Sequence, residues 1–184
     1  MEFKGVKINI VAIVILLVLI SFFVGQHFYK VYNIDKPIKE EIAGVDGVKE
    51  VEMVNKDGKM DMILSLDPAI DFYHVYKEIE GIFADSKIND KGSIIIKNES
   101  NSDLDNVYYR LHYAIYEGIK TSKFVTMEEN VAEVVEESEF TDYKLWIDNE
   151  AVYFQLNGDK TSLYKKIPYN KTITVHTEGG GSNG

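Results

Sequence analysis

The stretch from Val48 to Leu66 reads V-K-E-V-E-M-V-N-K-D-G-K-M-D-M-I-L-S-L. At its centre, N-K-D-G favours a tight turn, because Asp and Gly adopt positive φ at little energetic cost. After the turn, apolar residues occupy every second position from Met60 to Leu66, which is the pattern of a strand with one buried face. The stretch therefore predicts a β-hairpin with strands over residues 48–54 and 60–66.

A helix is predicted on each side of this hairpin. Before it, Pro37 suits the first turn of a short helix with Asp35 or Lys36 at its cap. After it, Asp67-Pro68 predicts a helix start, since Asp accepts hydrogen bonds from free amides and Pro fits the first helical position. The apolar residues of this second helix recur at three- and four-residue steps: Phe72, Val75, Tyr76, Ile79, Ile82 and Phe83.

The rest of the chain predicts one strand, two helices and a set of further strands. S-I-I-I-K over residues 93–97 is a short strand that we expect to be buried. Ser102 with Asp105, and Thr126 with Glu129, have the spacing of capping boxes that open two amphipathic helices. Strands are predicted over residues 143–148, 151–156 and 163–167, with residues 172–175 as an edge strand.

The predicted element order is α-β-β-α-β-α-α-β-β-β. It lacks the strict alternation of a doubly wound parallel sheet, so the fold class is α+β, with a mainly antiparallel sheet and two to three packed helices. Over residues 37–97 the order resembles that of the small ring-building modules of membrane-anchored secretion and sporulation channel proteins. It also resembles heavy-metal-associated and other small α/β units. This likeness is one of element order and carries over no residue.

An apolar run precedes these elements, from Ile8 to Val24, and only Asn9 and Ser21 interrupt it. A helix of this length is about 26 Å long, close to the hydrocarbon thickness of a bilayer. The run is longer than the apolar core of a cleaved signal peptide, and no small-residue cleavage site follows it. We therefore expect a retained transmembrane helix, a single-pass signal-anchor, formed by Ile8, Ile10, Val11, Ile13, Val14, Ile15, Leu16, Leu17, Val18, Leu19, Ile20, Phe22, Phe23 and Val24.

The expected organisation is a short tail over residues 1–7, the anchor over 8–25, a juxtamembrane linker over 26–36, the α+β domain over 37–175 and a flexible Gly-rich tail over 176–184. About 150 residues after the anchor suffice for one ordinary domain or two very small ones. Lys4 and Lys7 precede the apolar run, and such residues mark the cytoplasmic side, although Lys30, Lys36 and Lys39 follow it. We expect the protein in the cell membrane with its main domain extracytoplasmic.

Composition excludes several classes of protein. The net charge is −10, and Arg110 is the only arginine, so no basic face is available for a nucleic acid. The chain has no cysteine, which excludes disulfides, thiolate metal sites and a thiol nucleophile.

No catalytic, cofactor or metal motif is recognised. The four histidines, His27, His74, His112 and His176, stand singly, without a metal-ligand spacing. Asn101, Asp103 and Asp105 have the spacing that opens a calcium loop, but Asn106 stands where that loop needs glycine, and a helix cap explains the same residues. We expect no enzyme, no cofactor and no metal.

The most acidic stretch runs from Glu128 to Glu150, and Glu133, Glu136 and Glu137 lie on a predicted helix within it. Such a stretch is either a solvated helix face or a patch for a cationic partner.

Aromatic residues are the second candidate contact feature. Tyr109, Tyr113 and Tyr116 share one predicted helix with Tyr108, at positions that cannot all face the same side. Trp146 lies on a predicted strand, where its neighbours point to the opposite face. Tyr and Trp supply large contact areas at interfaces, and core packing is the alternative for each of them.

The sequence thus predicts a single-span membrane-anchored protein with an extracytoplasmic interaction or assembly domain, acting with a protein partner or by self-association. The alternative is a membrane-tethered sensor or binding subunit for a small molecule, a peptide or a cell-wall component. An enzyme with an unrecognised carboxylate site is a third hypothesis.

Overall fold

The computed structural model describes residues 2–3, 6–30, 34–68, 70–88, 90–98, 102–140, 142–158 and 162–169, without the side chains of residues 2–9, 27 and 30. The chain divides into two compact units, unit 1 over Met1–Lys97 and unit 2 over Asn98–Gly184. Each unit has its own hydrophobic core. The sequence has no Pro- or Gly-rich linker that would mark this boundary.

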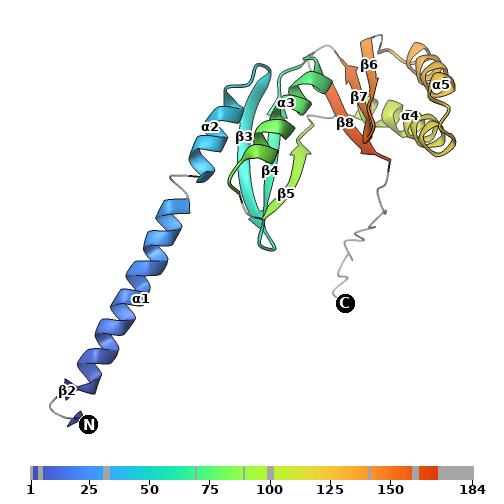
Figure 1. The fold of residues 1–184 in the computed structure, drawn as a ribbon. Coiled ribbons are helices and arrows are strands. Elements are labelled where there is room, and N and C mark those ends of the chain that lie inside the picture. The colour runs from blue at the N-terminus through green and yellow to red at the C-terminus, as the bar shows by residue number, and fades with distance from the viewer. Residues whose placement is uncertain are drawn as a thin grey trace, which may run out of the picture. The chain divides into compact units, whose positions relative to one another are not determined.

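Unit 1 begins with a long helix, α1 (Ile8–Lys30), after the two-residue strands β1 (Glu2–Phe3) and β2 (Val6–Lys7) (Figure 1). The helix covers 23 residues and continues into the stretch that we expect to be a linker. Its large apolar side chains between residues 10 and 24 are 42% to 64% exposed. Measured over the described part of the chain, no helix is both long enough and apolar enough to cross a membrane.

The folded part of unit 1 consists of α2 (Lys36–Ala43), β3 (Val48–Lys56), β4 (Lys59–Leu66), α3 (Phe72–Asp85) and β5 (Lys91–Ile96). The sheet order is β3-β4-β5; β3 and β4 pair antiparallel, while β4 and β5 pair parallel because α3 carries the chain back between them. Both helices contribute to a core with the strands, and its most buried members are Ile42, Met62, Leu64 and Ile79.

The predicted hairpin is confirmed. Lys56 pairs with Lys59, so Asp57 and Gly58 form a two-residue loop. Their φ angles are +53° and +82°, and positive φ at both positions is the type I′ turn that matches the twist of the strands. A residue with a Cβ is strained at position 58, and glycine removes that strain.

The predicted start of the second helix is wrong by four residues. Asp67 does not cap this helix, because its backbone N–H donates a hydrogen bond to the Gly47 carbonyl at 2.9 Å. Asp71 takes the N-cap position, and its carboxylate accepts from the His74 amide at 3.3 Å. The apolar stripe is as predicted, since four of its members are buried: Phe72, Tyr76, Ile79 and Phe83.

The predicted start of α2 is confirmed, since Asp35 stands at its N-cap and a proline lies in its first turn, although the Asp35 side chain makes no capping hydrogen bond. One further expectation for unit 1 is corrected. Strand β5 is an edge strand, not a buried one: Ile94 and Ile96 pack against the core, while Ile95 is 44% exposed on the other face.

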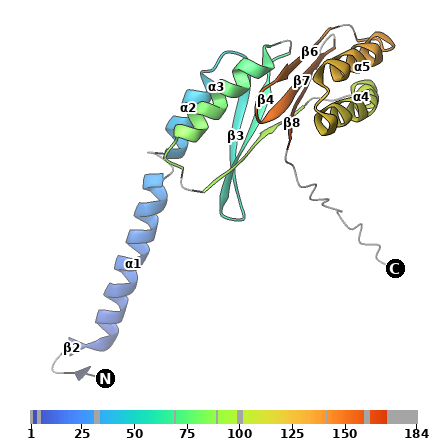
Figure 2. The ribbon, with the colours of Figure 1, turned by 45° about the vertical axis from the view of Figure 1, so that its right-hand side comes forward.

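Unit 2 consists of α4 (Ser102–Thr121), α5 (Phe124–Glu136), β6 (Asp142–Ile147), β7 (Ala151–Asn157) and β8 (Ser162–Pro168). The strands form an antiparallel sheet in the order β6-β7-β8. All seven residues of the central strand β7 are buried. Leu111, Ile115 and Val131 from the helices pack with Phe154 and Leu156 of β7, so the two helices share a core with one face of this sheet (Figure 2).

Strand β8 is an edge strand that a side chain covers. The Oδ1 atom of Asn98 accepts from the Tyr164 amide at 2.7 Å, and its Nδ2 atom donates to the Tyr164 carbonyl at 3.2 Å. The carboxamide of Asn98 therefore pairs with the backbone of β8 as a neighbouring strand would.

Helix α5 begins two residues before the predicted capping box. Lys123 is at the N-cap position without a side-chain hydrogen bond, and Thr126 lies inside the helix. Phe124 packs against the core and lies 6.1 Å from the ring of Tyr169, which explains why it belongs to the helix.

The fold is α+β, with five helices and two small sheets rich in antiparallel pairs among the described residues. From α2 onward the element order α-β-β-α-β-α-α-β-β-β is the predicted one. The predicted edge strand over 172–175 and the Gly-rich tail lie outside the described residues.

Candidate interaction surface

Three acidic residues singled out in the sequence lie together at the end of α5. Glu133, Glu136 and Glu137 are all exposed. Glu137 forms an ion pair with Arg110 of α4. Arg110 thus neutralises one carboxylate of this group, and Glu133 and Glu136 make up its outward acidic part.

Nearby carboxylates also act on a tyrosine of β6. The Tyr143 hydroxyl donates to Glu128 Oε1 at 2.9 Å. Burial, this hydrogen bond and the charges of Glu128 and Glu136 raise the pKa of Tyr143 to about 12. The acidic helix therefore packs against the sheet through a phenol that stays neutral at physiological pH.

Tyr109 and Tyr113 form an exposed pair on α4. Their side chains are 65% and 60% exposed, although a large apolar ring ordinarily favours burial. The ring centroids lie 5.4 Å apart at 90°, and the Tyr113 hydroxyl donates to the Tyr109 hydroxyl at 2.8 Å. This hydrogen bond raises the pKa of Tyr113. The pair is a preformed aromatic feature on the surface of unit 2.

Ring contacts extend this pair along the helix. The His112 ring lies 5.8 Å from Tyr113, 4.3 Å from Tyr116 and 6.3 Å from Tyr108. Tyr108 and Tyr116 are each four residues from His112, so these three rings lie on neighbouring positions of the helix surface, and Tyr113 follows His112 directly in the chain. We call these five residues, Tyr108, Tyr109, His112, Tyr113 and Tyr116, the aromatic band. From the sequence His112 is considered only as a metal ligand, and its one signal as a member of this band is its spacing of four from two tyrosines.

The band meets the core at Tyr108 and Tyr116. Lys165 of β8 lies 5.0 Å from the centroid of this ring. Burial raises the pKa of Tyr108 to about 12, with a further contribution from Tyr116. Burial also lowers the pKa of Lys165, against the opposing effect of Asp105. Tyr108 therefore fixes one side of the band in the fold, while Tyr109 and Tyr113 stay accessible.

Trp146 does not join the aromatic band. It alternates on β6 with Tyr143 and Leu145, which pack against the core, so its ring is on the opposite face of the sheet. The Nζ atom of Lys144 lies 5.5 Å from its ring centroid. The structure therefore brings the candidate tyrosines together and places the tryptophan apart from them.

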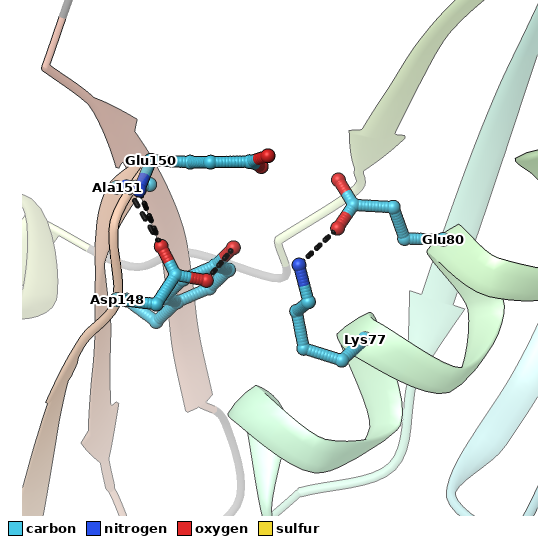
Figure 3. Close-up of polar contacts among 6 residues, drawn as sticks. Lys77, Glu80, Asp148, Glu150 and Ala151 are labelled. Carbon is cyan, nitrogen blue, oxygen red and sulfur yellow. Dashed lines mark hydrogen bonds and ion pairs between the residues drawn. The ribbon is translucent and has the colours of Figure 1, made fainter.

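The turn between β6 and β7 is organised by one carboxylate. Asp148 Oδ1 accepts from the amides of Glu150 and Ala151 at 2.8 and 3.0 Å, and its Oδ2 accepts from the Tyr153 hydroxyl at 3.0 Å (Figure 3). The Tyr169 hydroxyl donates to the Asp148 carbonyl at 2.6 Å. Burial and the charge of Asp148 raise the pKa of Tyr169. Every one of these contacts is internal to unit 2, so they indicate a structural role.

In unit 1, two polar contacts at α3 join residues three positions apart. Lys77 donates to Glu80 at 2.6 Å, three residues on along the same helix (Figure 3). The His74 Nδ1 atom lies 3.0 Å from its capping partner Asp71. Within the described ranges, no three His, Cys, Asp or Glu side chains come close enough to hold a metal ion.

The positions of the other candidate metal-ligating residues are as follows. Asp103 and Asp105 lie in the first turn of α4, where negative charge stabilises a helix N-terminus. Asn101 and His176, and the side chain of His27, are outside the described part.

A hollow of unit 1 is lined by residues of α1, among them Gln26 and Tyr29, and by residues near the β3–β4 turn and the start of β5, among them Gly58, Lys87 and Asp90. It holds a single lysine and a single aspartate among its lining residues, and no histidine.

Comparison of the chain with models of protein families, with curated proteins and with solved structures gave no match.

Proposed function

We propose that this protein is a membrane-anchored interaction module. In this proposal α1 inserts into a membrane, the part of unit 1 from α2 onward and unit 2 stand on its extracytoplasmic side, and the aromatic band of unit 2 binds a protein partner or a second copy. The observation that carries the proposal is the exposed Tyr109–Tyr113 pair, because well-packed tyrosines are enriched where interfaces gain most of their energy.

The surface of α1 supports the membrane part. The large apolar side chains between residues 10 and 24 are exposed on all sides, and water is an unfavourable solvent for such a surface. The backbone helix itself has 23 residues and is about 34 Å long.

The negative net charge of unit 2 supports a partner with a positively charged surface. This unit holds 15 acidic and 8 basic residues, a net charge of −7, whereas unit 1 has 15 and 12, a net charge of −3. Glu133 and Glu136 place part of this charge on an exposed helix face. A field of one sign steers the encounter with an oppositely charged surface.

One experiment tests both parts on the full chain. Membranes that contain the protein are first washed with alkaline carbonate, and we expect the protein to stay with the lipid because α1 is inserted. The washed membranes are then cross-linked and solubilised, and the protein is captured in three forms: unchanged, Y109S/Y113S and V125S. Val125, which is 74% exposed on α5, serves as the matched control.

We expect one discrete cross-linked species with the unchanged protein and with V125S, and a loss of about tenfold or more with Y109S/Y113S, as the removal of two interface tyrosines implies. Release by carbonate would refute the anchor. Equal yields from all three forms would refute the tyrosine surface. Protease added to intact cells should cleave units 1 and 2, and complete resistance would reverse the orientation.

A further inference from the structure

Two lysines face each other at the tip of the β3–β4 hairpin. Lys56 and Lys59 are direct partners in the antiparallel register, so their side chains leave the same face of the hairpin. Both are exposed. Like charges directly opposite each other destabilise a pair of strands, and neither lysine forms an ion pair among the described residues. An external anion between them would relieve this repulsion.

A third lysine lies near the same end. Lys87 is exposed in the connection from α3 to β5, and it lines the same hollow as Gly58 of the turn. The Met60 amide donates to the Asp90 carbonyl at 2.7 Å, which ties this connection to the base of the hairpin. We call Lys56, Lys59 and Lys87 the tip lysines.

Chain connectivity places this end of unit 1 next to the end of α1. Only residues 31–35 separate α1 from α2, and five residues reach at most about 20 Å. Helix α2 runs back along β3, so its first turn is the end of the helix that lies nearer the hairpin tip (Figures 1 and 2). A bilayer that holds α1 is therefore within reach of the tip lysines.

We propose that the tip lysines bind the anionic headgroups of the bilayer that holds α1. This inference rests on the proposed membrane insertion of α1. Lipid phosphates supply the negative charge that the opposed ammonium groups lack, and lysines close to an anionic membrane surface are attracted to it. Asp57 and Asp90 lie at the same end, so the contact depends on the placement of the lysines more than on a large net charge.

The contact also fixes an orientation. When the hairpin tip is bound to the bilayer, the strands of the β3-β4-β5 sheet run away from the lipid surface. The opposite end of this sheet, near Asp46, Lys49 and Lys97, then lies far from the bilayer. These residues follow from topology: β3 begins at that end, and β5 ends there because it is parallel to β4. They provide the matched controls for a test.

The test uses full-length protein reconstituted into vesicles. The natural chain has no cysteine, so a single N55C substitution beside the turn, or D46C at the opposite end, provides one site for attaching a fluorescent label. Vesicles are either neutral phosphatidylcholine or phosphatidylcholine with phosphatidylglycerol, and each contains a headgroup quencher. Flotation of the vesicles reports the insertion of α1 independently of the fluorescence.

We expect the label at position 55 to be quenched in anionic vesicles and much less in neutral ones, and the label at position 46 to be unquenched in both. K56Q/K59Q should reduce the quenching to the neutral level, while K49Q/K97Q leaves it unchanged. Raising the salt from about 0.1 M to about 1 M, where the screening length falls from about 10 Å to about 3 Å, should also abolish it.

The outcomes separate this inference from the proposed function. Protein that does not float with the vesicles refutes the anchor itself. Protein that floats, but whose label at position 55 is insensitive to lipid charge or to K56Q/K59Q, refutes headgroup binding and leaves the anchor standing.

Discussion

At the residue scale, Asp148 shows how much of unit 2 depends on one side chain. It accepts hydrogen bonds from two turn amides and from the Tyr153 hydroxyl, and its carbonyl accepts from Tyr169. The sequence predicts a turn at this place, but the hydroxyl partners are five and 21 residues away. Contacts of that kind follow from the fold and cannot be obtained from local spacing.

The D148A substitution should destabilise unit 2 by about 2 to 3 kcal/mol, since amides and a hydroxyl lose a charged acceptor. D148N keeps an acceptor oxygen for the amides and should cost about half as much. Trp146 is the only tryptophan and lies in unit 2, so urea unfolding followed by its fluorescence measures this stability. N149A at the neighbouring exposed position is the control; an equal loss there would contradict the assignment to the carboxylate.

At the element scale, the sequence predicts which segments are helices and strands better than where they begin. Periodicity identifies α3 and β4 because burial follows from their own side chains. The start of α3 is mispredicted because Asp67 and Asp71 are both plausible caps, and the backbone bond from Asp67 to Gly47 decides between them. The sequence also does not predict that β4 and β5 pair in parallel. Helix α3 separates the two strands along the chain, and local sequence does not encode pairing between such distant segments.

Helices α4 and α5 pack closely together at Gly118. A Cβ atom added there would lie 2.7 Å from Met127 Sδ and closer still to its Cβ. G118A should therefore force the helices apart and destabilise the protein by about 1 to 3 kcal/mol. Gly81 of α3 is the matched control, because nothing lies within 4 Å of its added Cβ.

For G81A we expect a gain of about 0.5 to 1 kcal/mol, since alanine restricts the unfolded chain and favours a helix. Thermal unfolding followed by circular dichroism compares the two variants. If G118A were as stable as the unchanged protein, the close packing of α4 on α5 would be disproved.

At the scale of the whole molecule, the main difference from expectation is the division into two units. No residue belongs to both cores, so each unit buries its own apolar side chains. The contact features were predicted in part: the crowding of tyrosines on α4 follows from the sequence, but the Arg110–Glu137 pair joins residues 27 positions apart and does not.

Because the cores are separate, damage to one should stay in its unit. Leu111 is fully buried in the core of unit 2, and L111A should cost about 2 to 5 kcal/mol there. Hydrogen exchange followed by mass spectrometry should show faster exchange in peptides from unit 2 and unchanged exchange in β3 and β4. Faster exchange in both units would mean that they unfold as one body.

The carboxamide of Asn98 on Tyr164 has a consequence for the way copies of this chain can combine. A filament that grows by adding sheet to sheet needs a receptive strand on both sides of every subunit. Along β8 one backbone position is already taken by Asn98, and Pro168 has no N–H to offer. A further strand would therefore find fewer free hydrogen-bonding groups along β8, which protects this edge from sheet-to-sheet growth.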